Sequence, residues 1–193
     1  MRRALLWSVS IFVVTWVTNA AADPPKLKGE YGFTGSAACL VTAAPGPGFN
    51  PNFTPTDGSF GQSSAVEGIR TFNGDGTGTV KGSSMGITIP ANTNSAGSDD
   101  FSLSFTYTVN EDGSWTSTVS GLETGTIKTG PRAGQTFTVS NSSPGTGMIS
   151  RNGGTLTLAT LDPTVEIVTF SNGDVHKRIC HRSRVFIKLE HER

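Results

Sequence analysis

Gly82, Ser84 and Gly86 match the Gly-x-Ser-x-Gly pattern that places a serine nucleophile on a sharp turn between a strand and a helix. The helix matters because its N-terminus helps to hold the oxyanion. The residues after Gly86 are Ile-Thr-Ile-Pro, which predict no helix. We therefore expect no catalysis by Ser84, and the sequence offers no other catalytic residue.

Cysteine and histidine side chains form the second group that could do chemistry. Cys39, His176, Cys180 and His181 are of the types that bind zinc. On a strand, at about 3.3 Å per residue, His176 and Cys180 lie about 13 Å apart on one face and His181 points to the other. This spacing disfavours a metal site, and no metal is expected.

A disulfide between Cys39 and Cys180 suits the same residues better. They are the only two cysteines of the chain, so an oxidising compartment allows one intramolecular pairing. Closure of a sheet brings terminal strands together, which places both cysteines within reach. Two separately buried thiols, behaving as small apolar residues, are the alternative.

Arginine and lysine side chains could bind anions. Arg70 shares a strand face with Val66 and Phe72, and if that face is interior, Arg70 pairs with a carboxylate or awaits an anionic ligand group. Ile69 allows the opposite register, with Arg70 outside. A basic run near the C-terminus is either a solvated edge strand that discourages unwanted pairing or a contact for an anionic surface. It comprises Lys177, Arg178, Arg182, Arg184 and Lys188.

The N-terminus predicts export. Arg2 and Arg3 precede an apolar run over 4–17 and small residues over 19–22, the order of a secretory signal. We expect cleavage after residue 22 and a single domain over 23–193, with a retained anchor as the alternative and no membrane span after cleavage. Cleavage leaves 13 basic residues against 15 acidic ones, a net charge of −2 that argues against a nucleic-acid partner.

The elements that position these residues are strands. Apolar and polar residues alternate over 101–109 and again over 114–121, and Gly113 suits a bulged turn between them. Further strands are expected at 27–34, 38–42, 65–72, 77–81, 87–89, 123–128, 135–140, 155–159, 165–170 and 175–181, the last extended or followed by 183–189.

This pattern predicts an all-β chain. Short strands joined mostly by hairpin turns favour a single antiparallel up-and-down β-barrel of about eight to ten strands, with a β-sandwich as the alternative. A long loop over 43–61 holds four prolines and four glycines. Some of its phenylalanines, Phe49, Phe53 and Phe60, are expected to cap one end of the barrel.

Two runs carry a resemblance. The residues at 29–40, with Tyr31-Gly-Phe33-Thr-Gly, and those at 70–79, with a Gly-Asp-Gly turn, resemble small secreted bacterial proteins of uncharacterised function. This resemblance implies a secreted barrel and transfers no catalytic residue. A looser similarity is to lipocalin-like barrels, in which a Gly-x-Trp near the start closes the base. Gly29-Glu30-Tyr31 stands at the corresponding place, with tyrosine instead of tryptophan.

The sequence therefore predicts a secreted, non-enzymatic barrel that holds a small apolar or amphipathic ligand and needs no cofactor. An envelope interaction module and a barrel isomerase similar to allene oxide cyclases are the alternatives. The candidate ligand or cap residues are Phe49, Phe53, Phe60, Arg70 and Tyr107.

Overall fold

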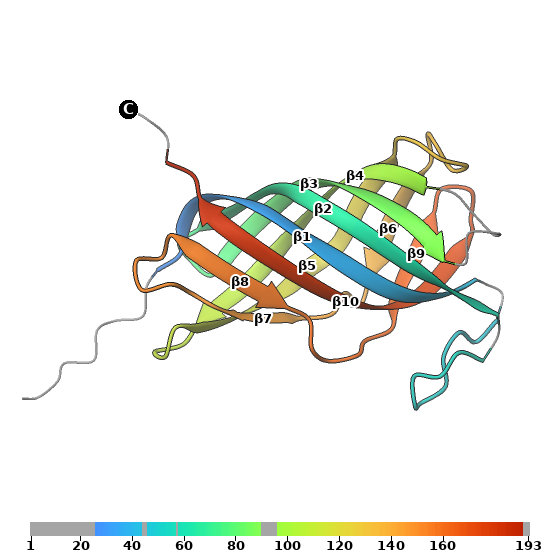
Figure 1. The fold of residues 1–193 in the computed structure, drawn as a ribbon, viewed down its shortest axis with the longest axis horizontal. Coiled ribbons are helices and arrows are strands. Elements are labelled where there is room, and N and C mark those ends of the chain that lie inside the picture. The colour runs from blue at the N-terminus through green and yellow to red at the C-terminus, as the bar shows by residue number, and fades with distance from the viewer. Residues whose placement is uncertain (1–25, 44–45, 57, 90–95, 191–193) are drawn as a thin grey trace, which may run out of the picture.

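The structure is a computed structural model that describes residues 26–43, 46–56, 58–89 and 96–190. Within these ranges it contains ten β-strands and no helix (Figure 1). The strands are β1 (Lys28–Ala43), β2 (Ser59–Asn73), β3 (Thr77–Ile89), β4 (Ala96–Val109), β5 (Ser114–Ile127), β6 (Thr136–Ser140), β7 (Gly145–Met148), β8 (Thr155–Ala159), β9 (Glu166–Phe170) and β10 (Val175–Lys188).

The strands form one closed antiparallel barrel, which confirms the predicted fold. Strands β1 to β6 follow one another around the wall, β9 and β10 continue it, and β10 pairs with β1 to close it. Tyr31 of β1 lies opposite Lys188 of β10, and the pairing continues to Ala43 opposite His176. β10 pairs with β1 on one side and with β9 and β8 on the other, so the basic run does not lie on an edge strand.

Between β5 and β10, different strands form the two ends of the barrel wall. The first half of β5 pairs with β7 and its second half with β6, while the first half of β10 pairs with β9 and its second half with β8. The β6–β9 pair therefore completes the wall at one end, and the β7–β8 hairpin completes it at the other (Figure 1). We call the junction between these two pairs the seam.

Several strands are longer than the sequence predicts. The strands expected at 27–34 and 38–42 are one strand, β1, and those at 77–81 and 87–89 are both part of β3. Small residues such as Gly35 and Ala37 hide the alternation in sequence, yet they continue the ladder because the neighbouring strand pairs with them. β7 is not among the strands expected from the sequence, and β4 begins at Ala96, five residues before the strand expected over 101–109.

Three hairpins use the same turn. The short turns of β2–β3, β4–β5 and β9–β10 contain Gly76, Gly113 and Gly173, whose φ angles are 87°, 80° and 90°. Glycine suits this left-handed position because it has no Cβ. The bulged turn predicted at Gly113 is confirmed.

Aromatic side chains fill one end of the barrel, here called the closed end. Trp115, Tyr31, Phe72 and Phe105 are fully buried, and the ring of Phe72 lies edge-on to those of Tyr31, Phe105, Tyr107 and Trp115. Their polar atoms are satisfied, since Tyr31 Oη donates to Gly153 O (2.8 Å), Tyr107 Oη to Leu27 O (2.7 Å) and Trp115 Nε1 to Thr157 O (2.9 Å). The closed end is thus a packed core.

Phenylalanine rings cover inward-facing glycines on neighbouring strands. Phe33 lies opposite Gly68, Phe101 opposite both Gly82 and Gly125, and Phe137 opposite Gly125. A Cβ added at Gly125 would lie 2.3 Å from Phe137 Cζ, so the ring occupies the space of the missing side chain. Such pairs let a sheet curve strongly while its inner face stays filled.

The predicted disulfide between Cys39 and Cys180 is present. The two cysteines face each other across β1 and β10, with Cα atoms 4.1 Å apart and an S–S distance of 2.06 Å. The predicted signal at 1–22 lies outside the described residues, and within the described ranges no helix has the length and apolar character to cross a membrane.

Candidate functional site

A cavity of about 180 Å³ lies inside the barrel, between the aromatic closed end and the opposite end, here called the mouth. A wider space of about 580 Å³ occupies the mouth. Cavity and mouth adjoin, because Gln62, Asp99, Phe137 and Arg178 line both.

Strand alternation arranges the cavity in layers. On β2 the inward residues run from Gln62 near the mouth, through Val66, to Arg70 and the aromatic core. On β4 they run from Asp99 through Leu103 to Phe105, in the same direction. The cavity therefore has a charged layer near the mouth, an apolar middle and one arginine at its deep end.

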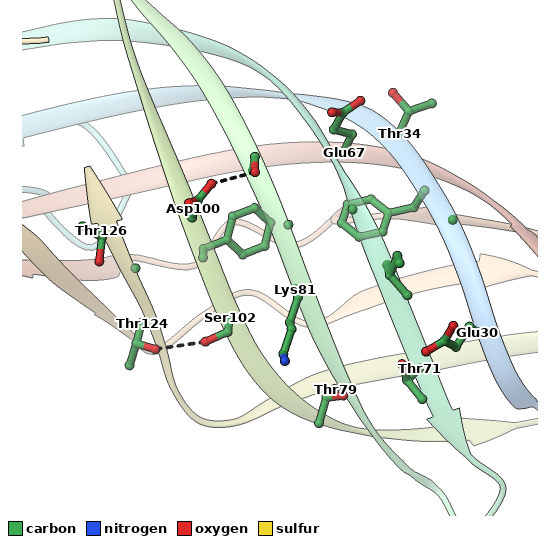
Figure 2. A pocket seen from close by; sticks show the side chains of 18 of the residues that line it. Glu30, Thr34, Glu67, Thr71, Thr79, Lys81, Asp100, Ser102, Thr124 and Thr126 are labelled. Carbon is green, nitrogen blue, oxygen red and sulfur yellow. Dashed lines mark hydrogen bonds between the residues drawn. The ribbon is translucent and has the colours of Figure 1, made fainter. Parts of the chain in front are cut away.

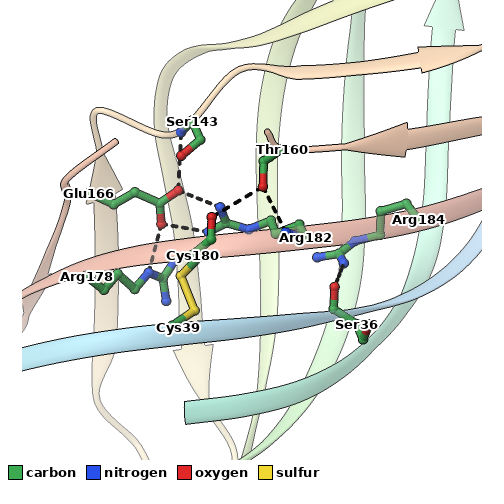
Figure 3. Close-up of a disulfide and its surroundings, with 9 residues drawn as sticks. All are labelled: Ser36, Cys39, Ser143, Thr160, Glu166, Arg178, Cys180, Arg182 and Arg184. Carbon is green, nitrogen blue, oxygen red and sulfur yellow. Dashed lines mark hydrogen bonds and ion pairs between the residues drawn. A yellow bond between two sulfur atoms is a disulfide. The ribbon is translucent and has the colours of Figure 1, made fainter. Parts of the chain in front are cut away.

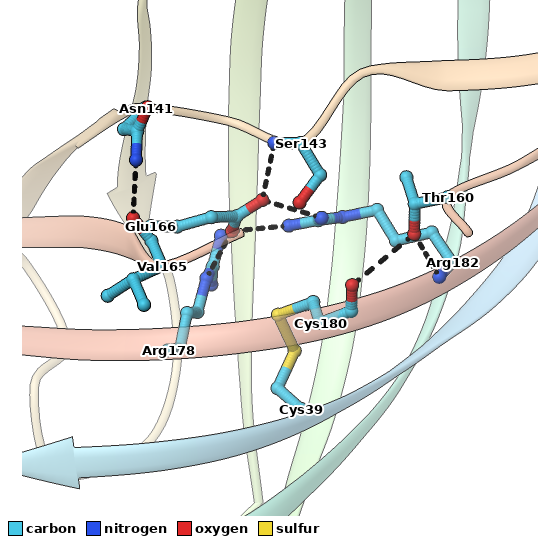
Figure 4. A network of polar contacts seen from close by, with 9 residues as sticks. All are labelled: Cys39, Asn141, Ser143, Thr160, Val165, Glu166, Arg178, Cys180 and Arg182. Atoms are coloured by element: carbon cyan, nitrogen blue, oxygen red, sulfur yellow. Dashed lines mark hydrogen bonds and ion pairs between the residues drawn. A yellow bond between two sulfur atoms is a disulfide. The ribbon is translucent and has the colours of Figure 1, made fainter. Parts of the chain in front are cut away.

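The charged layer is centred on Glu166, whose side chain is fully buried at the seam (Figures 3 and 4). Arg182 donates from both terminal nitrogens to the two carboxylate oxygens at 2.6 Å, and Arg178 Nε donates to Oε2 at 2.8 Å. The backbone N–H of Ser143 donates to Oε1 at 3.2 Å. Thr160 Oγ1 accepts from the backbone N–H of Arg182 at 2.8 Å, so both sides of the seam are tied to β10.

The ion cluster shifts the pKa values of Glu166 and Arg182 in opposite directions. Burial alone would raise the pKa of Glu166, but the nearby guanidinium groups of Arg182 and Arg178 lower it to about 2. Burial likewise acts to lower the pKa of Arg182, and the charge of Glu166 outweighs it and raises that pKa. Glu166 and Arg182 are therefore both ionised at neutral pH.

Two further carboxyl groups face the same layer. Burial raises the pKa of Glu123, against the opposing effect of Arg178 and Arg182. Burial also raises the pKa of Asp99, although Ser84 Oγ donates to Asp99 Oδ2 at 2.8 Å. Both groups thus hold a proton more readily than an exposed acid does.

Arg70 lies alone at the deep end. Its Cζ is 3.6 Å from the centre of the Phe105 ring, and the rings of Phe72, Trp115 and Phe186 surround it within 5.5 Å. Its Nη2 donates to Ser117 Oγ, while its Nε has no hydrogen-bond partner. Burial lowers its pKa to about 9, so the group remains charged at neutral pH.

Aromatic and basic groups line the mouth. His176 lies edge-on to Phe60 and Phe170, with ring centres 6.2 and 5.1 Å away. Burial and then the positive charge of Arg132 lower the pKa of His176, so the imidazole is neutral at physiological pH. Arg132 stacks on Phe170 at 4.3 Å and bonds Asp174 at 2.7 Å.

An open groove crosses the outer face of the barrel (Figure 2). Threonine and serine hydroxyls dominate it, with charged side chains between them. Several of these groups satisfy one another: Ser83 Oγ donates to Asp100 Oδ1 at 2.8 Å, and Lys128 Nζ lies 2.9 Å from Asp100 Oδ2. The three acids that line the groove, Glu30, Glu67 and Asp100, outnumber its one lysine, Lys81, and none of these four side chains is buried as Arg70 is.

The structure brings only some of the predicted site residues together. Arg70 and Phe60 line the interior, at the deep end and at the mouth. Phe49 is half-buried within its own loop, opposite Pro55, and Phe53 is 42% exposed, so neither is shown to cover the mouth. Tyr107 belongs to the aromatic core and lines neither the cavity nor the mouth.

The basic run has a different place from the outer surface suggested by the sequence. Arg178, Arg182 and Arg184 alternate along β10 and all line the cavity, while Lys177 donates to Pro47 O at 2.8 Å. Ser84 lies inside strand β3, so it is not on the strand-to-helix turn of a hydrolase. Cys39 and Cys180 form the disulfide, and His176 and His181 point to opposite sides of the wall.

Sequence reasoning missed Glu166, Glu123 and Asp99. For Glu166 a signal existed: the turn around Gly173 sets the β9–β10 register, which places Glu166 directly opposite Arg178. No comparable local signal marks Glu123 or Asp99, whose neighbours come from distant strands. No known family model matches the chain, and no curated protein or solved structure is significantly similar to it.

Proposed function

We propose that this protein is an exported, non-enzymatic β-barrel that binds a small amphipathic ligand inside the barrel. The observation that carries the proposal is the cavity of about 180 Å³ that adjoins a wider mouth. A barrel of eight strands has room for a filled core or for one small ligand. Here the core fills the closed end and leaves the space beyond it open.

The lining of the cavity supports an amphipathic rather than a purely apolar ligand. Val66, Leu103 and Val119 offer apolar walls, and Arg70 and Ser117 offer polar contacts at the deep end. Pockets of this kind combine apolar area for affinity with a few polar groups for orientation. Phe60 and Phe170 at the mouth add aromatic surface along the entry path.

Native mass spectrometry of protein purified from its own source tests the proposal. We expect an extra mass that is lost on denaturation. Ser64→Trp fills the cavity from β2 and should abolish this extra mass, whereas Ala65→Trp places the same side chain on the outer face and should retain it. Two results together would contradict the proposal. The purified protein would carry no bound mass, and wild type and Ser64→Trp would give the same result in ligand screens.

Export is part of the same proposal. The disulfide supports it, because such bonds persist in oxidising compartments. N-terminal sequencing of the mature protein should begin at Asp23 or within a few residues of it. Detection of Met1 on the mature protein would refute cleavage.

An envelope interaction module is the second candidate, and one surface feature favours it. Met85, Ile87 and Ile89 form an exposed apolar row on the outer face of β3, with 54%, 45% and 54% of their surfaces accessible. Replacing all three by serine should abolish co-purification of a cross-linked envelope partner if this candidate is right. Unchanged cross-linking would reject it.

A further inference from the structure

Arg70 is a buried charge without an ionic partner. It is 7% exposed, and no acidic group within the described residues forms an ion pair with it. The acids that line the cavity, Asp99 and Glu123, lie in the charged layer near the mouth. Leu103 and Val119 separate that layer from Arg70 along β4 and β5.

The surroundings of Arg70 compensate its charge only in part. Burying an unpaired charge is costly, and the guanidinium recovers some free energy from the four aromatic rings around it. Ser117 accepts one hydrogen bond, and Nε donates none. A guanidinium offers five N–H donors in a planar fork that matches a carboxylate. The site thus has donor capacity and positive charge left for a ligand.

The size of the cavity limits the ligand. A cavity of about 150 Å³ in another protein holds benzene, and the space here is about 180 Å³. A single guanidinium neutralises a monoanion, whereas a second negative charge on a phosphate would remain unpaired in a buried site. The apolar middle layer, with Val66, Leu103 and Val119, suits a compact hydrocarbon body.

We propose that the ligand is a small organic monocarboxylate whose acidic group binds Arg70 and whose apolar body fills the middle of the cavity. This inference rests on the proposed function and adds the chemical class of the ligand. The other three arginines of the cavity, Arg178, Arg182 and Arg184, face the three acids Glu166, Glu123 and Asp99, so Arg70 supplies the unpaired positive charge of the interior.

Isothermal titration with matched acids and amides tests the inference. Benzoate and acetate each carry the carboxylate, and benzamide and acetamide have the same shapes without the charge. We expect at least one acid to bind about tenfold or more tightly than its amide, which corresponds to about 1.4 kcal/mol. Equal affinity of acids and amides, or no binding of any of the four, would overturn the inference.

Two arginine variants test whether the carboxylate binds at Arg70. Arg70→Met removes the charge at similar volume and should abolish the preference for the acid. Arg151→Met removes an exposed arginine in the turn between β7 and β8 and should leave that preference unchanged. If Arg70→Met does not fold, NMR shifts of Leu103 and Val119 methyl groups on addition of benzoate to the wild type decide instead. Shifts confined to other residues would overturn the inference.

Native mass spectrometry distinguishes failure of the carboxylate inference from failure of the proposed ligand-binding function. A neutral molecule bound to the purified protein, together with no preference for the acids, overturns the carboxylate and leaves ligand binding intact. A bare protein that binds neither acids nor amides overturns both. A bound monocarboxylate lost in Arg70→Met supports both.

Discussion

Replacing Glu166 by glutamine tests whether the buried ion cluster holds the barrel wall together at the seam. The carboxylate accepts hydrogen bonds from Arg178, from Arg182 and from the backbone N–H of Ser143. Glutamine keeps the volume but loses the charge, and its amide N–H₂ cannot accept from a guanidinium. Removing one partner from a buried ion pair destabilises a protein by about 3–5 kcal/mol.

The pKa of Glu166 gives a second route to the magnitude. A carboxyl whose pKa falls from 4.5 in the unfolded chain to about 2 in the barrel stabilises the fold by about 3 kcal/mol at neutral pH. Because the folded pKa is the lower one, this contribution is present above pH 4.5 and is lost as the pH falls toward about 2. The difference between wild type and Glu166→Gln should shrink over the same window.

Urea unfolding followed by tryptophan fluorescence measures this difference. Trp115 is fully buried and is the only tryptophan after residue 16, so its emission reports on the core. Asp174→Asn is the matched control, because it breaks the more exposed pair with Arg132 and should cost about 0–1 kcal/mol. A loss below about 1 kcal/mol for Glu166→Gln at pH 7, or a loss that stays constant down to pH 2, would refute the reasoning.

Three further predictions concern the disulfide, Glu123 and the glycines under the phenylalanine rings. Reduction should lower the free energy of unfolding by up to about 4–5 kcal/mol, because the bond closes a loop of 141 residues; denatured, unreduced protein that alkylates two thiols would exclude the bond. Glu123→Gln should stabilise the protein at neutral pH, and this gain in stability should vanish in acid. Burial raises the pKa of this carboxyl, so the folded state favours its protonated form. A gain in stability that is independent of pH in urea titrations would contradict this cause. Gly125→Ala should lower the free energy of unfolding by about 1–3 kcal/mol, because the added Cβ would overlap the ring of Phe137. Gly58→Ala, with open space around it, should leave the melting temperature unchanged. Equal melting temperatures of the two variants would rule out the packing argument.

Much of the fold follows from local sequence, because local sequence controls the alternation of faces and the turns. The residues over 101–121 alternate with period two and enclose a turn that needs a glycine at positive φ, which Gly113 supplies. Both strands and the turn could therefore be predicted. The disulfide could also be predicted, since two cysteines allow one bond and closure of the sheet brings β1 beside β10.

Strand ends and the inserted hairpin could not be predicted in the same way. Gly35 and Ala37 interrupt the apolar pattern of β1, and only the pairing with β2 shows that the strand continues through them. β7 has four residues, Gly-Thr-Gly-Met, whose composition carries almost no strand signal. It is a strand because β5 has an unpaired half beside it.

The sequence by itself determined that this chain is built of antiparallel strands with one cysteine pair, because these properties depend on neighbours along the chain. It left open which face of β2 is the inner one, because Ile69 allows Arg70 on either side, and it placed Arg178, Arg182 and Arg184 of β10 on the outer surface because they are charged. Only tertiary structure decided that all four point inward, since Glu166 from β9 neutralises part of their charge and aromatic rings from other strands enclose Arg70. Such compensation arises between residues far apart in the chain, and it appears only when the sheet is closed.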